Sequence, residues 1–290
     1  MRVSVLVALL VFQVTTALGQ APRLTADERR AFQIHGVTES FIRGIADAGV
    51  KDASAQELIA FRIHGVSPSF VQELEEAGID ESDPQDLIAF RIHRVTPEFA
   101  REMRSLLGRV DGSELVSYRI HRVTPDFIAE MDDLGLEVEH PGEYTAFRIH
   151  GVSPEYVAQV RGWGFSDIQS GDLIAFRIHR IDADFLEEMA DLGLTNLTTR
   201  QALRLRIYRV DARYREEMRD LGLTNFTADR LVAMKILEVD RRLVRDLSDQ
   251  RYEDVSIERL LRRAGRKGDY KWIEDDLRSA IGSVVRDLTR

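Results

Sequence analysis

The sequence predicts an all-α fold: a right-handed α-solenoid of about eight two-helix repeats, each of about 29 residues, with a C-terminal capping helix. Three observations lead to this prediction. A histidine recurs at a nearly constant interval, each interval contains the start and stop signals of two short helices, and the first and last units depart from the pattern as the ends of a stack do.

The histidine marks the same position in six successive units, with a step of 29 residues everywhere except for one step of 28. This histidine ladder consists of His35, His64, His93, His121, His150 and His179. Tyr208 and Leu237 continue its register through two more units. The surrounding residues repeat as well, since positions 58–64 and 173–179 both read LIAFRIH. The repeats therefore override the two-domain organisation that 290 residues would otherwise suggest.

Helix A, the first helix of each unit, is predicted to begin ten residues before the histidine. Thr25 with Glu28, and Ser54 with Glu57, have the spacing of a capping box, which satisfies backbone N–H groups of the first turn. The residue after the histidine is expected to end the helix, because glycine readily adopts a left-handed conformation there. That position is occupied by Gly36, Gly65 and Gly151, and in other units by Arg94, Arg122 and Arg180.

Helix B is predicted to follow at once. In the second unit Ser67 precedes Pro68, and a serine cap before a proline at the first helical position is a typical N-terminus. Helix B ends at a glycine followed by an apolar residue, which is the pattern of a Schellman motif. The pairs are Gly49-Val50, Gly78-Ile79, Gly135-Leu136, Gly164-Phe165, Gly193-Leu194 and Gly222-Leu223.

Packing between units is predicted to stabilise these helices, because helices of ~10 residues are too short to persist alone in water. Helix B has one apolar stripe, represented by Phe70 and Leu74. In helix A the apolar residues, including Leu58, Phe61 and Ile63, spread over about half of the helical circle. We therefore expect helix A to be the inner, more buried helix.

The two ends of the array differ from its middle. Arg29 and Arg30 occupy the positions that Leu58 and Ile59 hold in the second unit, as expected of a terminal repeat whose outer face has no neighbour. Eight tandem helix-turn-helix repeats are assigned to residues 25–255, and C-terminal capping helices to residues 256–290. The last of these helices, which begins at Asp269, is expected to seal the final repeat.

Residues 1–19 have the three parts of a secretory signal peptide: a positive charge at Arg2, a short apolar core, and small residues at Ala17 and Gly19. Residues 20–24 are then a short linker, and we expect a chain exported to the periplasm or secreted. The alternative is a retained membrane anchor, although the apolar run is shorter than the ~20 residues that span a bilayer. The chain has no cysteine, so no disulfide contributes to its stability.

Composition and motifs exclude several classes of function. A net charge of −9 argues against nucleic acid as a partner, since neutralising many phosphates requires a basic surface. The sequence contains no G-x-S-x-G, P-loop, H-E-x-x-H or glycine-rich dinucleotide motif. Its polar residues recur with the repeat, whereas a catalytic constellation is normally built once per fold. We therefore expect no enzymatic activity and no cofactor.

Two rows of polar side chains are the candidate binding residues. The histidine ladder shares a helix face with an acid seven residues earlier, and both are lost after the sixth unit. Three roles stay open for it: packing and hydrogen bonding near the turn, pH sensing, and metal binding across repeats. The arginine ladder comprises Arg62, Arg91, Arg119, Arg148, Arg177 and Arg206, and ends in Lys235. These arginines are expected to lie between repeats and pair with carboxylates, the alternative being a row that binds anions.

Three segments carry a resemblance to a known class of repeat: IHGVSP at 63–68, RIHRVTPDF at 119–127 and HGVSPEY at 150–156. They resemble tandem two-helix repeats of bacterial exported proteins, similar to those in the tails of some proteins related to BlaR/MecR-type antirepressors. The resemblance covers roughly residues 25–255 and implies the repeat fold. It implies no protease role, because this sequence has neither the zinc-protease motif nor the multi-helix membrane part.

The leading functional hypothesis is a non-enzymatic exported scaffold that holds a protein or peptide partner on an extended surface of similar patches. A metal- or anion-binding repeat protein that uses the histidine or arginine ladder is the alternative. An enzyme would need a cleft with non-repeating polar residues, for instance around Trp163. Contact with a membrane is expected only if the signal segment is retained.

Overall fold

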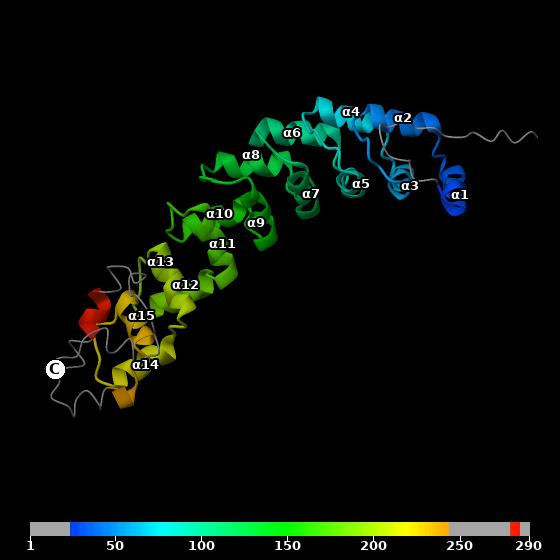
Figure 1. The fold of residues 1–290 in the computed structure, drawn as a ribbon. Helices are drawn as coiled ribbons and strands as arrows, with labels where there is room; N and C mark the ends of the chain where they lie inside the picture. Colours follow the sequence, from blue (N-terminus) through cyan, green and yellow to red (C-terminus); the bar gives the residue numbers. More distant parts are fainter. Residues whose placement is uncertain (1–23, 244–278, 285–290) are drawn as a thin grey trace, which may run out of the picture. The chain divides into compact units, whose positions relative to one another are not determined.

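The structure is a computed structural model that describes residues 24–243 and 279–284. Within these residues the fold is all-α, as predicted, and contains no strand (Figure 1). The helices are α1 Ala26–His35, α2 Glu39–Asp47, α3 Ala55–His64, α4 Pro68–Glu76, α5 Pro84–His93, α6 Pro97–Leu107, α7 Gly112–His121, α8 Pro125–Asp133, α9 Gly142–His150, α10 Pro154–Gly162, α11 Ser170–His179, α12 Ala183–Asp191, α13 Thr199–Ile207, α14 Ala212–Asp220 and α15 Ala228–Ile236.

The chain divides into two compact units, Met1–Ile120 and His121–Arg290. In the first unit α1, α3 and α5 pack in succession, and so do α2, α4 and α6 (Figure 1). In the second unit α9, α11, α13 and α15 pack in the same way. Odd-numbered helices correspond to helix A of the sequence pattern and even-numbered helices to helix B. Equivalent helices of neighbouring repeats therefore pack against each other, as in a helical repeat protein.

Cap chemistry places the helix starts where the sequence predicted them. The Ser54 hydroxyl accepts a hydrogen bond from the Glu57 N–H at 3.3 Å, and the Glu57 carboxylate accepts one from the Ser54 N–H at 2.8 Å. Thr25 and Glu28 form the same capping box on α1. Helix B starts equally sharply, since Ser67 caps α4 and Pro68 occupies its first turn. Side-chain caps thus set the helix starts in both classes of helix.

The predicted stop signals are confirmed at the helix ends. Gly65, after α3, has the left-handed backbone expected of it, with φ at +78°. Arg94 takes the same conformation after α5, with φ at +60°. After α2, the Val50 N–H donates to the Ile45 carbonyl at 3.1 Å, the long hydrogen bond of a Schellman motif, and Val50 is buried.

Helices of both classes bury one side only, except α15, in which seven of nine residues are buried. On α4 the buried residues are Phe70, Val71 and Leu74, and on α3 they are Leu58 and Phe61. The expectation that helix A is the inner helix is wrong at Ile63, which is 57% exposed. The apolar arc of helix A is wide because it includes residues on the solvent side as well as those in the core.

The structure describes part of each end of the array. Arg29 and Arg30 are exposed, and α1 has no buried residue. Residues 279–284 are helical, and Ile281 and Val284 are fully buried. The predicted signal peptide and most of the predicted capping helices lie outside the described residues. In the described part of the chain, every helix is too short or too polar to cross a bilayer.

Candidate functional site

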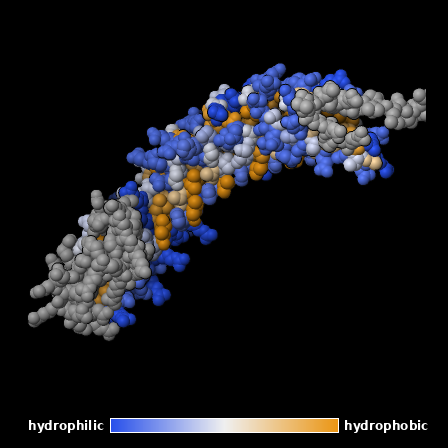
Figure 2. All heavy atoms as spheres, in the orientation of Figure 1, coloured by the Kyte–Doolittle hydropathy of each residue, from blue (hydrophilic) through white to orange (hydrophobic). Residues whose placement is uncertain are grey.

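A row of exposed isoleucines, one in each A helix from α1 to α13, is the largest departure from the expected burial, while the equivalent Ile236 of α15 is buried. Each lies directly before a ladder histidine or, in α13, before Tyr208, and each is 51–69% exposed. We call these residues the isoleucine row: Ile34, Ile63, Ile92 and Ile120 in the first unit, and Ile149, Ile178 and Ile207 in the second. Among the described residues, Leu106 on α6 is the only other large hydrophobic residue that is exposed. Figure 2 shows hydrophobic residues at the surface among hydrophilic ones.

Helix geometry explains why these side chains face water. At 3.6 residues per turn, Ile63 lies about 170° from the midpoint of Leu58 and Phe61, the two buried residues of α3. The side chain therefore points away from the core. A signal for this was present in the sequence, because an isoleucine precedes each ladder histidine opposite the core positions. Sequence reasoning missed it by treating the whole apolar arc as buried.

The arginine ladder lies between repeats, as predicted, but it pairs with aromatic rings instead of carboxylates. Each member places its guanidinium over the ring of the preceding helix B, and Lys235 does the same with its ammonium group. The distances from the charged group to the ring centroid are 5.0 Å for Arg62–Phe41, 4.8 Å for Arg91–Phe70, 3.7 Å for Arg119–Phe99, 3.9 Å for Arg148–Phe127, 3.6 Å for Arg177–Tyr156, 5.0 Å for Arg206–Phe185 and 3.7 Å for Lys235–Tyr214.

Three of these arginines also cap the preceding helix A. Arg62 Nε donates to the His35 carbonyl at 3.2 Å, Arg91 to that of His64 at 3.4 Å, and Arg206 to that of His179 at 3.1 Å. These are the arginines at 4.8–5.0 Å from their rings, whereas the closer ones have no such bond. A cation at a helix C-terminus is favourable because carbonyl groups there lack helical partners. Among the described residues no ladder arginine lies within ion-pair distance of a carboxylate.

A second set of arginines lies at the same edge, directly after helix A. These residues, which we call the edge arginines, are Arg94, Arg122, Arg180 and Arg209. All four are exposed and have left-handed φ values of 53–60°. None forms an ion pair or a side-chain hydrogen bond with another described residue. Four exposed cations therefore face solvent beside the isoleucine row, in a conformation that favours glycine.

The histidine ladder follows the same edge without converging. His35 and His64 are exposed, and the other four are half-buried. None of the six imidazoles hydrogen-bonds to another described residue. The hydrogen bonds at this position are instead those that ladder arginines donate to the backbone carbonyls of His35, His64 and His179. The described residues contain no group of three or more histidine, aspartate or glutamate side chains placed to hold a metal ion. The geometry thus gives the metal-binding alternative no support.

The acids seven residues before the histidines are engaged at the other end of helix A. Hydrogen bonds from the backbone and hydroxyl of Ser54 hold the pKa of Glu57 below its ordinary value. Glu57 also accepts a hydrogen bond from Gln85 Nε2 of the next repeat at 3.2 Å. The capping role predicted for these acids is confirmed at Glu28 and Glu57.

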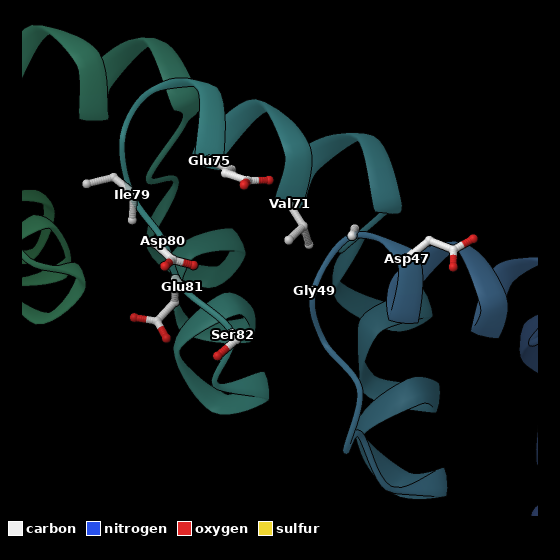
Figure 3. A pocket seen from close by; sticks show the side chains of 9 residues that line it. Asp47, Gly49, Val71, Glu75, Ile79, Asp80, Glu81 and Ser82 are labelled. Atoms are coloured by element: carbon white, nitrogen blue, oxygen red, sulfur yellow. The ribbon is translucent and has the colours of Figure 1, made fainter. Parts of the chain in front are cut away.

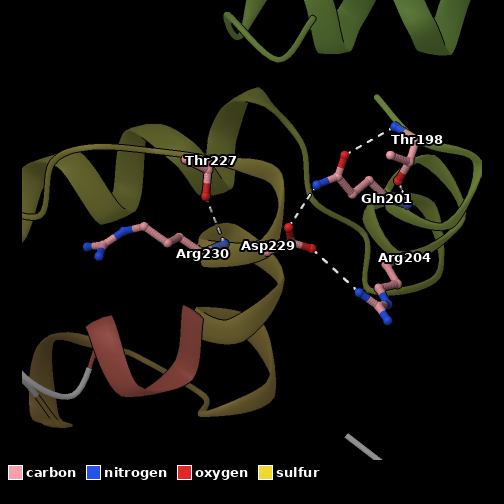
Figure 4. A network of polar contacts seen from close by, with 6 residues as sticks. All are labelled: Thr198, Gln201, Arg204, Thr227, Asp229 and Arg230. Carbon is pink, nitrogen blue, oxygen red and sulfur yellow. Dashed lines mark hydrogen bonds and ion pairs between the residues drawn. The ribbon is translucent and has the colours of Figure 1, made fainter. Parts of the chain in front are cut away.

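In the last repeats a different polar network replaces the acid and the histidine (Figure 4). Gln201 Nε2 donates to the Asp229 carboxylate at 2.7 Å, and Arg204 forms an ion pair with the same group at 3.5 Å. These contacts join α13 to α15. The neighbouring Arg230 is buried and donates to the Ser283 hydroxyl in the C-terminal segment. The change in sequence after the sixth unit therefore accompanies a local change in how repeats are joined.

Two surface hollows lie elsewhere in the described part of the chain. One, of about 270 Å³, is lined by Asp47, Glu75, Asp80 and Glu81, whose carboxylates point in different directions (Figure 3). Burial raises the pKa of Glu81 above its ordinary value. The other, of about 490 Å³, is lined by Tyr156, Trp163 and Arg177 among others. Neither hollow contains a histidine, and the Ser82 hydroxyl in the first makes no hydrogen bond to a carboxylate of another described residue.

Comparison with known proteins gives no assignment: no protein-family model matches the chain, and no curated protein matches it. The functional argument therefore depends on the residues and their geometry.

Proposed function

We propose that this chain is a non-enzymatic, exported α-helical repeat scaffold that binds a protein or peptide partner on the outward face of its A helices. In this proposal its eight repeats form a right-handed solenoid, so that equivalent residues of successive repeats form extended rows. The observation that carries the proposal is the exposure of the isoleucine row.

The physical argument concerns the hydration of apolar surface. Single exposed hydrophobic residues are common and need no explanation, but contiguous exposed patches are typical of interaction sites. The isoleucine row occupies one equivalent position in seven A helices, always on the side away from the core. Covering apolar surface with a partner releases roughly 25 cal/mol per Å². A repeated patch of this kind supports binding of an extended segment better than binding of a small ligand.

The alternative, a metal- or anion-binding repeat protein, is supported less well. The ladder histidines do not converge, and the ladder arginines already contact rings and carbonyl groups. Of the two arginine sets, the edge arginines are the one with exposed charges that pair with no other described residue. They lie next to the isoleucine row, so their charge is more simply understood as part of the same surface.

Affinity capture with the chain from residue 20 tests the proposal. The row variant carries Ile63→Gln, Ile92→Gln, Ile149→Gln and Ile178→Gln, and the control variant carries Leu106→Gln, which alters an exposed hydrophobic residue on helix B. We expect the wild type and the control to recover the same protein from the exported fraction, and the row variant to lose it. Equal recovery by the row variant, folded by circular dichroism, would rule out the proposed surface.

A further inference from the structure

The A-helix surface alternates between ridges and furrows. The isoleucine row forms the ridges, because each of its side chains points directly away from the core. Three residues before each isoleucine except Ile207, where Arg204 takes this position, stands a small, half-buried residue on the flank of the helix: Ala31, Ala60, Ala89, Ser117, Ala146 and Ala175. At 3.6 residues per turn these side chains lie about 60° from the isoleucine, toward the next repeat. Short side chains there leave a furrow between one isoleucine and the next.

The spacing of the ridges selects the kind of segment that can follow them. Packed helices lie about 8–10 Å apart, so ridges recur at about that interval. An α-helix laid across them presents the same face every seven residues, a rise of about 10.5 Å. A heptad sequence has apolar residues at positions a and d. If the a residues meet the ridges, the d residues lie about half-way between two ridges and face the furrows. An extended strand repeats its face every ~6.7 Å and loses register with the ridges.

The charged residues beside the isoleucine row indicate which charge the bound segment should carry. On the C-terminal edge of the A helices are the edge arginines, which are exposed and unpaired among the described residues, together with the ladder arginines. This edge is basic although the whole chain carries a net charge of −9. At the other edge, acids such as Glu57 are occupied by helix capping. Charge complementarity therefore favours acidic side chains on the border of the segment that meets the arginines.

The backbone at the edge arginines supports a binding role. A residue other than glycine in the left-handed region is strained, because its Cβ lies too close to the following carbonyl oxygen. Gly36, Gly65 and Gly151 fill the same position in other repeats, so glycine is compatible with the fold. Arginine at four of these positions makes no polar contact within the described chain that would offset its strain. Backbone strain that no contact within the protein offsets is typical of residues that bind a ligand.

These observations favour a helix over the other surfaces that could cover the row. An anionic membrane would meet a protein of net charge −9 with acids along one border of the row. A second copy of the chain has acidic B helices, but their apolar residues, such as Phe70 and Leu74, are buried in their own repeats.

Resting on the proposed function, we propose that the isoleucine row binds an acidic amphipathic α-helix of a partner protein, with apolar residues at heptad spacing. Each ridge meets one heptad layer. The three ridges of the second unit, which also contains Arg122, Arg180 and Arg209, therefore correspond to a helix of about three heptads, some 20 residues. The edge arginines pair with carboxylates along one side of that helix.

Fluorescence anisotropy with a designed probe tests this inference. The probe is a labelled synthetic peptide of about three heptads, with leucine at positions a and d and glutamate at e and g. Two matched peptides serve as controls: one with lysine in place of glutamate, and one with proline in the middle heptad. The arginine variant carries Arg122→Gly, Arg180→Gly and Arg209→Gly, and Leu106→Gln is again the control variant.

We expect the wild type and Leu106→Gln to bind the acidic peptide at least about tenfold more tightly than either control peptide, a difference of about 1.4 kcal/mol. The row variant and the arginine variant should each bind it at least about tenfold more weakly. The arginine variant should unfold at the same temperature as the wild type or higher, because glycine relieves the left-handed strain. Added salt should weaken binding of the acidic peptide in the wild type.

Equal binding of the acidic, basic and proline peptides would overturn the inference, as would an unchanged affinity in both variants. Sedimentation of the wild type with vesicles containing anionic lipid, lost in the row variant, would overturn it in favour of a membrane surface. Self-association that the row variant abolishes would overturn it in favour of a second copy. If the designed peptide fails but affinity capture still depends on the row, this inference falls and the proposed function stands.

Discussion

At the residue scale, the position directly after each A helix shows how local strain and surface charge are linked. Gly65 takes a left-handed conformation freely, and the guanidinium of Arg91 packs over it. Arg94 takes the same conformation with a side chain that favours other conformations. The two residues therefore form a natural pair for measuring what this position contributes to stability.

Gly65→Ala should lower the free energy of unfolding by about 1–2 kcal/mol, because alanine is strained at a φ of +78°. Its Cβ would also approach Arg91 Nη2 to 3.1 Å, which that flexible side chain can accommodate. Arg94→Gly should instead raise the free energy of unfolding, by up to about 1 kcal/mol. Urea unfolding of the two variants measures both effects. A neutral Gly65→Ala together with a destabilising Arg94→Gly would contradict this account of the position.

At the scale of the element, a capping box gives the A helices α1, α3 and α13 a defined start. Hydrogen bonds from Ser54 to the Glu57 carboxylate lower the pKa of Glu57 in the folded state. Its contribution to stability is therefore present above the ordinary glutamate pKa of 4.5 and is lost as the pH falls through the lower pKa of the folded state. At α13 a glutamine serves the same purpose, since Gln201 accepts from the Thr198 N–H at 3.1 Å.

Glu57→Gln should keep the capping box and remove its pH dependence, as the glutamine of α13 indicates. We expect the wild type to be more stable than the variant near pH 6 and this difference to shrink by pH 3. Denaturant unfolding at the two pH values measures the difference. A difference that is equal at both would show that the carboxylate charge contributes nothing to the cap.

Sequence alone was sufficient for features that depend on neighbouring residues. The caps at Ser54 and Ser67 and the left-handed ends at Gly65 and Arg94 are local, and all lie where the pattern placed them. Features that depend on contact between repeats were not accessible in this way. The periodicity of helix A does not show which part of its apolar arc the neighbouring repeats cover. The sequence therefore predicts burial of Ile63 together with the core residues of the same arc.

The arginine ladder shows the same limit. Its place between repeats was predicted, but its partners were expected to be carboxylates. Phe70 lies 21 residues before Arg91, and the same interval separates most of the other pairs. This constant spacing was present in the sequence, but only the packing of successive repeats shows that it brings the two side chains together.

At the scale of the whole molecule, each unit is held together by packing between equivalent helices of neighbouring repeats. Stability then arises mainly between nearest neighbours, and every repeat adds a similar patch to the surface. In both units the A helices carry exposed isoleucines with arginines beside them. A surface extended in this way suits a partner that is itself extended, which is the central claim of the proposed function.

Site-specific photo-cross-linking in the exported fraction tests that claim most directly. A photoreactive amino acid replaces Ile63 or Ile178 in separate variants, and Leu106 in a control. The proposed function predicts a covalent adduct with the same partner from positions 63 and 178 and none from position 106. No adduct from either row position, or an equal yield from position 106, would contradict it.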